Sequence, residues 1–313
     1  LLRRHSSPIL STDAQKMHTC QRHTFLDNTD AAVEIPGRHT LRCVNRTRAE
    51  GGPPLGRITR GTTNPNRLRR CDRWLAGTQA WRLRLPMDPP VVVDLGYGAS
   101  PVTAVELFER LRRVRGDVEV LGLEIDPARV TAAAGLERPG LSFRRGGFEV
   151  PTADGRAVTV VRAFNVLRQY EEDEVEAIWA KVRSRLAPDG VLIDGTCDEL
   201  GRLASWIAVE PAAGPVSLTL SMRLRELSTP ADVAERLPKA LIHRNVPGER
   251  VHGFLVALDQ AWRYAAPQAA YGVRARFLET AARMRANGWP VLDGPARWRL
   301  GELSIRWDAV RPG

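Results

Sequence analysis

The sequence has few cysteines and no long hydrophobic run. Four cysteines occur in 313 residues, and no two of them form a CxxC pair. A chain of this length buries a core large enough to fold without disulfide staples, so we expect reduced thiols. No stretch of eighteen apolar residues occurs, which argues against a membrane-spanning helix. The first residues carry arginines and serines but no apolar block of signal-peptide length, and we expect a cytoplasmic protein with no membrane partner.

Standard metal-binding spacings are also missing. Five potential ligands lie near the start of the chain, namely His18, Cys20, His23, His39 and Cys43. Their spacings match no usual zinc pattern, so we predict no metal site.

Negative charge is scarce in the leading part of the chain. The formal net charge is +10, and residues 1–85 hold 16 Arg or Lys against 6 Asp or Glu, whereas residues 86–313 hold 30 of each. A basic segment of this kind suits contact with nucleic acid. Nearly all the cations are arginine, which a GC-rich coding bias also produces. A solvated tail is therefore an equally good interpretation of the basic segment.

Residues 1–55 show no sustained period of 2 or 3.6 residues and end in GGPP, which predicts a poorly ordered basic segment. We expect a central domain over residues 56–225 and a mainly helical extension or lid over residues 226–313, packed on the same domain.

Strand and helix patterns alternate through the central part. Strands are predicted at 91–97, 118–125, 141–146, 157–164 and 190–196, and helices at 101–115, 128–136 and 172–186. This order predicts a parallel sheet with right-handed crossovers. Two further strand-like runs, at 205–210 and 217–224, indicate an antiparallel hairpin at one edge. The expected fold class is α/β, a Rossmann-like three-layer sandwich with a mainly parallel sheet.

The most informative run is VVVDLGYGASP, from Val91 to Pro101. A buried strand leads into a turn at Gly96 and Gly98, where glycine permits a tight bend and leaves room for a ligand. In the dinucleotide fingerprint G-x-G-x-x-G the third glycine would fall at Pro101, and no GK[ST] motif follows. The turn therefore favours a nucleoside with a charged amino-acid tail, whose ammonium Asp94 would meet directly or through water.

A second acid ends the next strand. In LGLEID, Glu124 lies 26 residues after Gly98, a position from which a carboxylate accepts hydrogen bonds from ribose hydroxyls.

Four ordered signatures, VVDLGYGASP, LGLEIDP, AFNVL and LAPDGVLI, resemble the class I S-adenosylmethionine-dependent methyltransferases over about residues 90–225. The resemblance implies that Asp94, Gly96 and Gly98 hold the methionine part and that Glu124 holds the ribose. It places the segment GGFEVP near the adenine, with Phe148 or Glu149 as neighbours. It also places Asn165 at the floor of the cofactor site.

Methyl transfer from a sulfonium requires chiefly that donor and acceptor are aligned, so no catalytic residue has to stand out in the sequence. Candidates for the acceptor pocket are Arg168 and Tyr170 after the fourth strand, Asp198 after the fifth, and His243 in a polar cluster further on. We expect a small-molecule acceptor. An RNA methyltransferase using the basic segment RITRGTTNPNRLRR, a non-catalytic protein that keeps the fold as a binding module, and an NAD-linked enzyme remain alternatives.

Overall fold

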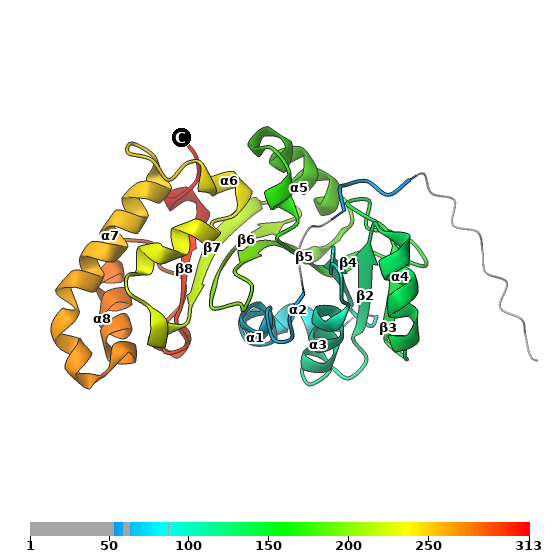
Figure 1. The fold of residues 1–313 in the computed structure, drawn as a ribbon, viewed down its shortest axis with the longest axis horizontal. Coiled ribbons are helices and arrows are strands. Elements are labelled where there is room, and N and C mark those ends of the chain that lie inside the picture. Colours follow the sequence, from blue (N-terminus) through cyan, green and yellow to red (C-terminus); the bar gives the residue numbers. More distant parts are fainter. Residues whose placement is uncertain (1–52, 59–62, 87) are drawn as a thin grey trace, which may run out of the picture. The chain divides into compact units, whose positions relative to one another are not determined.

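Figure 1 shows the computed structural model of the chain, which describes residues 53–58, 63–86 and 88–313. The potential metal ligands and nearly all of the predicted disordered segment lie outside these residues. Residues 51–313 belong to one unit. In the part of the chain that the structure describes, no helix has the length and apolarity to cross a membrane.

An eight-stranded sheet runs through the unit in the order β3-β2-β1-β4-β5-β6-β7-β8. Its strands are β1 (Val91–Leu95), β2 (Glu119–Glu124), β3 (Leu141–Arg145), β4 (Val158–Phe164), β5 (Leu186–Cys197), β6 (Leu203–Glu210), β7 (Gly214–Met222) and β8 (Glu302–Arg306). The first five strands pair in parallel, and β5 to β8 pair antiparallel. The predicted α/β fold with a mainly parallel half and an antiparallel hairpin is confirmed. The last strand, β8, pairs with β7 outside the β6–β7 hairpin and forms the edge of the sheet.

Helices cover both faces of the sheet (Figure 1). They are α1 (Arg69–Thr78), α2 (Ala80–Leu83), α3 (Val102–Leu111), α4 (Pro127–Ala133), α5 (Val175–Arg183), α6 (Lys239–Ile242), α7 (Arg250–Tyr264), α8 (Val273–Ala286) and α9 (Pro295–Trp298). One apolar core joins α1, α2 and α3 to what we call the first face. A larger core joins α5, α7 and α8 to the second face. All five residues of β1 are buried, and they point alternately to the two faces: Val92 belongs to the first core, whereas Val91 and Val93 belong to the second.

A buried carboxyl group lies in the middle of β5. Asp194 accepts a hydrogen bond from the Trp179 indole of α5 at 3.1 Å, and its second oxygen has no hydrogen-bond partner among the described residues. Burial raises the pKa of Asp194 to about 7, and the Trp179 hydrogen bond offsets only part of that effect. The folded protein therefore favours the protonated carboxyl more than the unfolded chain does.

This raised pKa predicts a pH-dependent stability. The contribution of Asp194 is fully present below pH 4 and is lost as the pH rises through about 7. Over that window the free energy of unfolding should fall by on the order of 4 kcal/mol. Asp194→Asn keeps an acceptor for Trp179 and carries no charge, so urea unfolding at pH 5 and pH 8 should show a flatter pH dependence. Asp189→Asn, at an exposed position of the same strand, is the matched control. Equal pH dependence in all three proteins would contradict the assignment.

Candidate functional site

The turn after β1 is tied to the end of β2. Gly96 and Gly98 have positive φ values of 69° and 83°, which glycine adopts readily. The Gly98 N–H donates to the Glu124 carboxylate at 2.9 Å, and the Ile125 N–H donates to its other oxygen at 2.9 Å. Arg129 lies 3.4 Å from the same carboxylate. Glu124 is therefore held in one orientation, at the carboxyl ends of the two strands where α/β sheets bind ligands.

Asp94 lies on the first face, beneath this turn, in a buried network of charges. Arg162 is its cross-strand neighbour on β4 and donates to it at 2.9 Å and 2.8 Å. The Thr103 hydroxyl of α3 donates to Asp94 at 3.0 Å. The other end of the Arg162 guanidinium bonds Asp72 of α1, which also bonds Arg110. The prediction that Asp94 meets a ligand's ammonium stays a prediction, while both of its oxygens already have partners within the protein.

Burial and the neighbouring charges shift the pKa values of Arg162 and Asp72. Burial alone lowers the pKa of Arg162, but Asp72 and Asp94 more than reverse this and hold the pKa above its usual value. Burial raises the pKa of Asp72, although Arg162 and Arg110 oppose the shift. The guanidinium of Arg162 is fully buried, so its charge is compensated by these carboxylates rather than by water.

A short segment, residues 53–58, contacts residues that follow β2, β3 and β4, and we call it the strap. The Leu55 carbonyl accepts a hydrogen bond from the Phe148 N–H at 2.9 Å, and the Leu55 N–H donates to the Glu149 carboxylate at 2.9 Å. The Arg57 N–H donates to the Tyr170 hydroxyl at 2.5 Å. The strap is thus held mainly through its backbone, and the Leu55 residue remains 43% exposed.

Several predicted site residues line one small hollow beneath the strap. Its walls comprise Leu55, Arg57, Leu95, Gly96, Glu124, Ile125, Gly146, Gly147, Phe148, Val166 and Tyr170. Phe148 and Tyr170 meet edge to face with ring centroids 5.3 Å apart. With the strap in place, the hollow leaves about 10 Å³ of space, roughly the room of a single water molecule.

The remaining predicted residues lie outside the lining of this hollow. The Asn165 carboxamide, at a residue with φ 58°, bonds the Cys197 backbone N–H at 3.0 Å and its sulfur at 3.5 Å. Burial raises the pKa of Cys197, which does not suit a thiolate nucleophile. Arg168 donates to the Glu235 carbonyl at 3.0 Å.

Two other acceptor candidates have contrasting surroundings. Asp198 accepts hydrogen bonds from the backbone N–H groups of Leu200, Arg202 and Leu203, and so organises the turn between β5 and β6. His243 follows α6 and is exposed. Neither is brought to the hollow under the strap.

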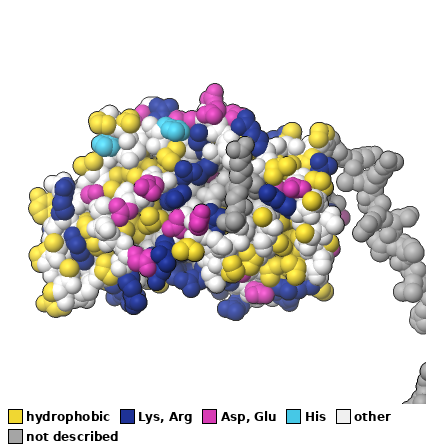
Figure 2. All heavy atoms as spheres, in the orientation of Figure 1, with side chains coloured by type: hydrophobic (Ala, Val, Ile, Leu, Met, Phe, Trp, Pro, Cys, Tyr) yellow, Lys and Arg dark blue, Asp and Glu magenta, His cyan; other side chains and the backbone are white. Residues whose placement is uncertain are grey.

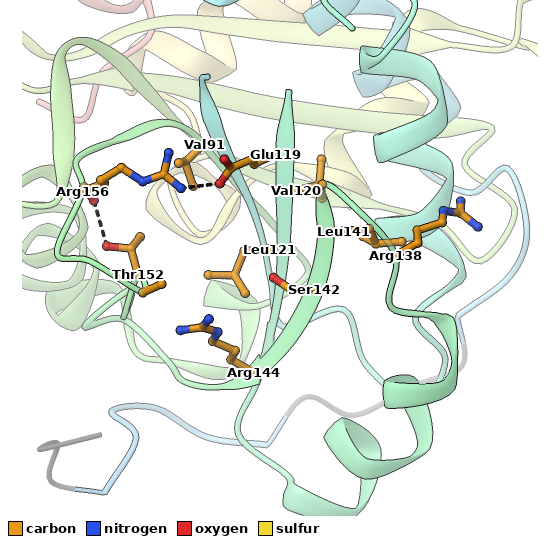
Figure 3. Close-up of a pocket in the computed structure, with 12 residues that line it drawn as sticks. Val91, Glu119, Val120, Leu121, Arg138, Leu141, Ser142, Arg144, Thr152 and Arg156 are labelled. Carbon is orange, nitrogen blue, oxygen red and sulfur yellow. Dashed lines mark hydrogen bonds and ion pairs between the residues drawn. The ribbon is translucent and has the colours of Figure 1, made fainter. Parts of the chain in front are cut away.

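A separate hollow of about 190 Å³ lies at the amino ends of β1, β2 and β3, opposite to the carboxyl ends that border the strap (Figure 3). It is lined by the first residues of three strands, Val91, Glu119 and Leu141, and by Arg156, which pairs with Glu119. None of the predicted site residues lies there. Within the described ranges, no group of three His, Cys, Asp or Glu side chains is arranged to hold a metal ion.

Sequence reasoning missed two parts of this region. The strap has no motif, and it acts through backbone groups that every residue type carries. Arg162 did leave a signal, because it is the single charge in the otherwise apolar and hydroxyl-bearing strand VTVVRAF.

No protein-family model matches the sequence, and no curated protein matches it. Solved structures with a partial likeness include the CMeT domain of the citrinin polyketide synthase (20% identity, TM-score 0.31), covering 38% of this chain and 32% of that one. A putative methyltransferase from Thermobifida fusca is 23% identical with a TM-score of 0.32, covering 42% and 52%. The plantazolicin methyltransferase BpumL in complex with SAH is 11% identical with a TM-score of 0.32, covering 42% and 48%. The chain thus spans about a third to a half of the length of these structures.

The buried network predicts a large effect of removing its central cation. Arg162→Met leaves Asp72 and Asp94 buried with their main partner lost, and should lower the free energy of unfolding by about 3–5 kcal/mol. Urea unfolding measures this loss. Arg113→Met, at an exposed position after α3, should change stability by less than about 0.5 kcal/mol. A loss below about 1 kcal/mol in Arg162→Met would show that the network is not needed for folding.

Proposed function

We propose that the hollow beneath the strap is the adenosyl site of an S-adenosylmethionine-dependent methyltransferase. The proposal rests on one hydrogen-bond donor and one acceptor in the hollow, both of which bond the strap. The Phe148 N–H offers a hydrogen-bond donor and the Glu149 carboxylate an acceptor, and the backbone of Leu55 satisfies both.

Adenine has the same complementary pattern on one edge. Its exocyclic amino group donates a hydrogen bond, and the neighbouring ring nitrogen accepts one. The N–H and carbonyl of Leu55 therefore present to Phe148 and Glu149 what an adenine edge would present. Ile125, Phe148 and Tyr170 supply apolar walls suited to a flat ring.

The rest of the site fits the same ligand. Glu124 lies beside the adenine groups in the lining, with its carboxylate oriented by Gly98 and Ile125, and a carboxylate there suits ribose hydroxyls. The Gly96–Gly98 turn would hold the methionine part. Phosphate-binding features are absent from the turn's sequence, because Pro101 replaces the third glycine of the dinucleotide pattern. When bound, the cofactor supplies an electrophilic methyl group, and this chain's residues orient the donor and exclude water.

The strap and the cofactor cannot occupy these groups together. A hollow of about 10 Å³ has no room for an adenosyl group, so binding requires residues 53–58 to leave. The apparent affinity is then the intrinsic affinity multiplied by the fraction of molecules with the strap displaced. The strap would in this way reduce cofactor binding from within the same chain.

A small-molecule acceptor fits better than RNA. Several arginines of the basic segment at 57–70 serve the fold itself: Arg57 donates to the Gln169 carbonyl, Arg67 to that of Asp198 and Arg70 to that of Gly201. On the face drawn in Figure 2, Lys and Arg side chains are interspersed with Asp and Glu rather than forming one continuous basic surface. Phosphate-led RNA binding depends on such a surface.

Calorimetry with S-adenosylmethionine tests the proposed function. Glu124→Ala removes the ribose acceptor, and its dissociation constant should rise by roughly 5- to 150-fold, or about 1–3 kcal/mol. Glu119→Ala, at the opposite end of the same strand, is the matched control and should bind as the wild type does. Thermal melts establish that both variants are folded. No heat with millimolar cofactor in the wild type, or binding of a nicotinamide coenzyme instead, would overturn the proposal.

A second prediction isolates the strap. A Cβ atom at Gly56 would lie 2.8 Å from the Ile125 side chain and 3.1 Å from the Tyr170 hydroxyl, at a φ of +141° that other residues rarely adopt. Gly56→Ala should therefore loosen the strap and tighten cofactor binding, by roughly tenfold. Gly155→Ala also replaces a glycine of positive φ, but its Cβ would meet nothing within 4 Å, so its affinity should be unchanged. Unchanged or weaker binding in Gly56→Ala would show that the strap does not compete with the cofactor.

A further inference from the structure

A third hollow, of about 290 Å³, is lined by four arginines. It lies between the start of α1, the β5–β6 turn and the residue after β7, and comprises Asn66, Arg69, Arg70, Leu200, Gly201, Arg202 and Arg223. None of these residues lines the hollow under the strap. We call this hollow the arginine pocket.

Positive charge in the arginine pocket is only partly compensated. Glu226 pairs with both Arg202 and Arg223, at 3.0 Å and 3.1 Å, and is itself 42% exposed. Within the described residues, no carboxylate lies at ion-pair distance from Arg69 or Arg70. Among the four guanidinium groups, Arg202 and Arg223 share Glu226. The buried carboxylate of Glu302 acts on Arg70 from further away and is itself paired with Arg73 and Arg297. The small concave space therefore keeps an excess of positive charge.

Arg70 is held in place by groups that do not neutralise it. Its guanidinium donates to the carbonyls of Gly201 and Leu300, both at 3.1 Å, and it is partly buried. Burial, followed by the neighbouring Arg73, lowers the pKa of Arg70 to about 10. Glu302 opposes the shift, while Arg69 and Arg223 add to it. A pre-oriented, crowded guanidinium of this kind gains most from an added anion, because the anion relieves repulsion as well as forming hydrogen bonds.

We propose that the arginine pocket binds an oxyanion, the phosphate or carboxylate group of a small molecule. The planar guanidinium groups suit both, since each offers paired N–H donors that match two oxygens. The helix start contributes in the same sense, because α1 begins at Arg69 without a side-chain cap. The proposal stands apart from the adenosyl site, because no residue is shared between the two.

Isothermal calorimetry with inorganic phosphate, and separately with acetate, tests the site on the full chain at constant ionic strength. Arg69→Ala removes a cation with no described ion-pair partner, so the fold should be retained, and phosphate affinity should fall by about tenfold. Glu226→Gln removes the competing carboxylate and should raise the affinity by about threefold. Arg113→Ala, at an exposed position in the turn after α3, is the control and should leave the phosphate affinity unchanged.

The opposite changes in Arg69→Ala and Glu226→Gln distinguish a site from general attraction to a basic protein. No phosphate or acetate binding by the wild type, or equal losses in Arg69→Ala and Arg113→Ala, would overturn the proposal. A short single-stranded RNA is the third probe. RNA binding that exceeds phosphate binding, falls steeply with salt and is lost in Arg69→Ala would assign the pocket to nucleic acid instead. Because no cofactor is added, the result does not depend on methyl transfer.

Discussion

The buried Arg162 guanidinium is the interaction on which the site geometry depends. It joins Asp94 of β1 to Asp72 of α1, and Thr103 of α3 adds bonds to both Asp94 and Arg162. The helix that precedes the sheet and the helix that follows the glycine turn are thereby fixed to the same two central strands. A buried charge without partners is costly, so these elements hold their positions together or lose the network together. The glycine turn between β1 and α3 inherits that rigidity, which is what a preorganised binding turn requires.

The buried network on the first face contrasts with the few contacts that hold the strap at the carboxyl ends of the strands. The strap is held by three backbone hydrogen bonds to Phe148, Glu149 and Tyr170, and by contacts of Arg57 with Gln169 and the Tyr170 ring. Each hydrogen bond contributes only about 0.5–1.5 kcal/mol net. Neither apolar core includes its side chains, so the proposed displacement of the strap would leave both cores intact. The affinity for any ligand of the hollow is then set jointly by the ligand and by these few bonds.

Periodicity in the sequence predicted most of the fold, while the roles of the site residues, named from motifs and a family resemblance, stay predictions. The strands and crossover helices follow from apolar runs that must be buried on both faces, and the hollow does bring Gly96, Glu124, Phe148 and Tyr170 together. Asp94 shows the limit of such reasoning, because its role depends on Arg162, 68 residues away, and only the register of β1 against β4 makes them neighbours. The strap was not predictable, since it binds through backbone groups that have no sequence signature.

The loop that holds the strap is ordered by its own hydrogen bonds. The Glu149 carboxylate bonds the Gly147 N–H at 2.8 Å as well as the Leu55 N–H, so its orientation is set by its own loop before anything else is bound. The Phe148 N–H belongs to that same loop. Donor and acceptor are therefore presented together on one side of the hollow, whichever partner fills it. Glu124 is buried beside the same loop, where it also ties the glycine turn to the end of β2. The proposed adenosyl ligand would use both parts of this arrangement, its adenine edge at the Phe148–Glu149 pair and its ribose at Glu124, whereas the strap uses only the Phe148–Glu149 pair.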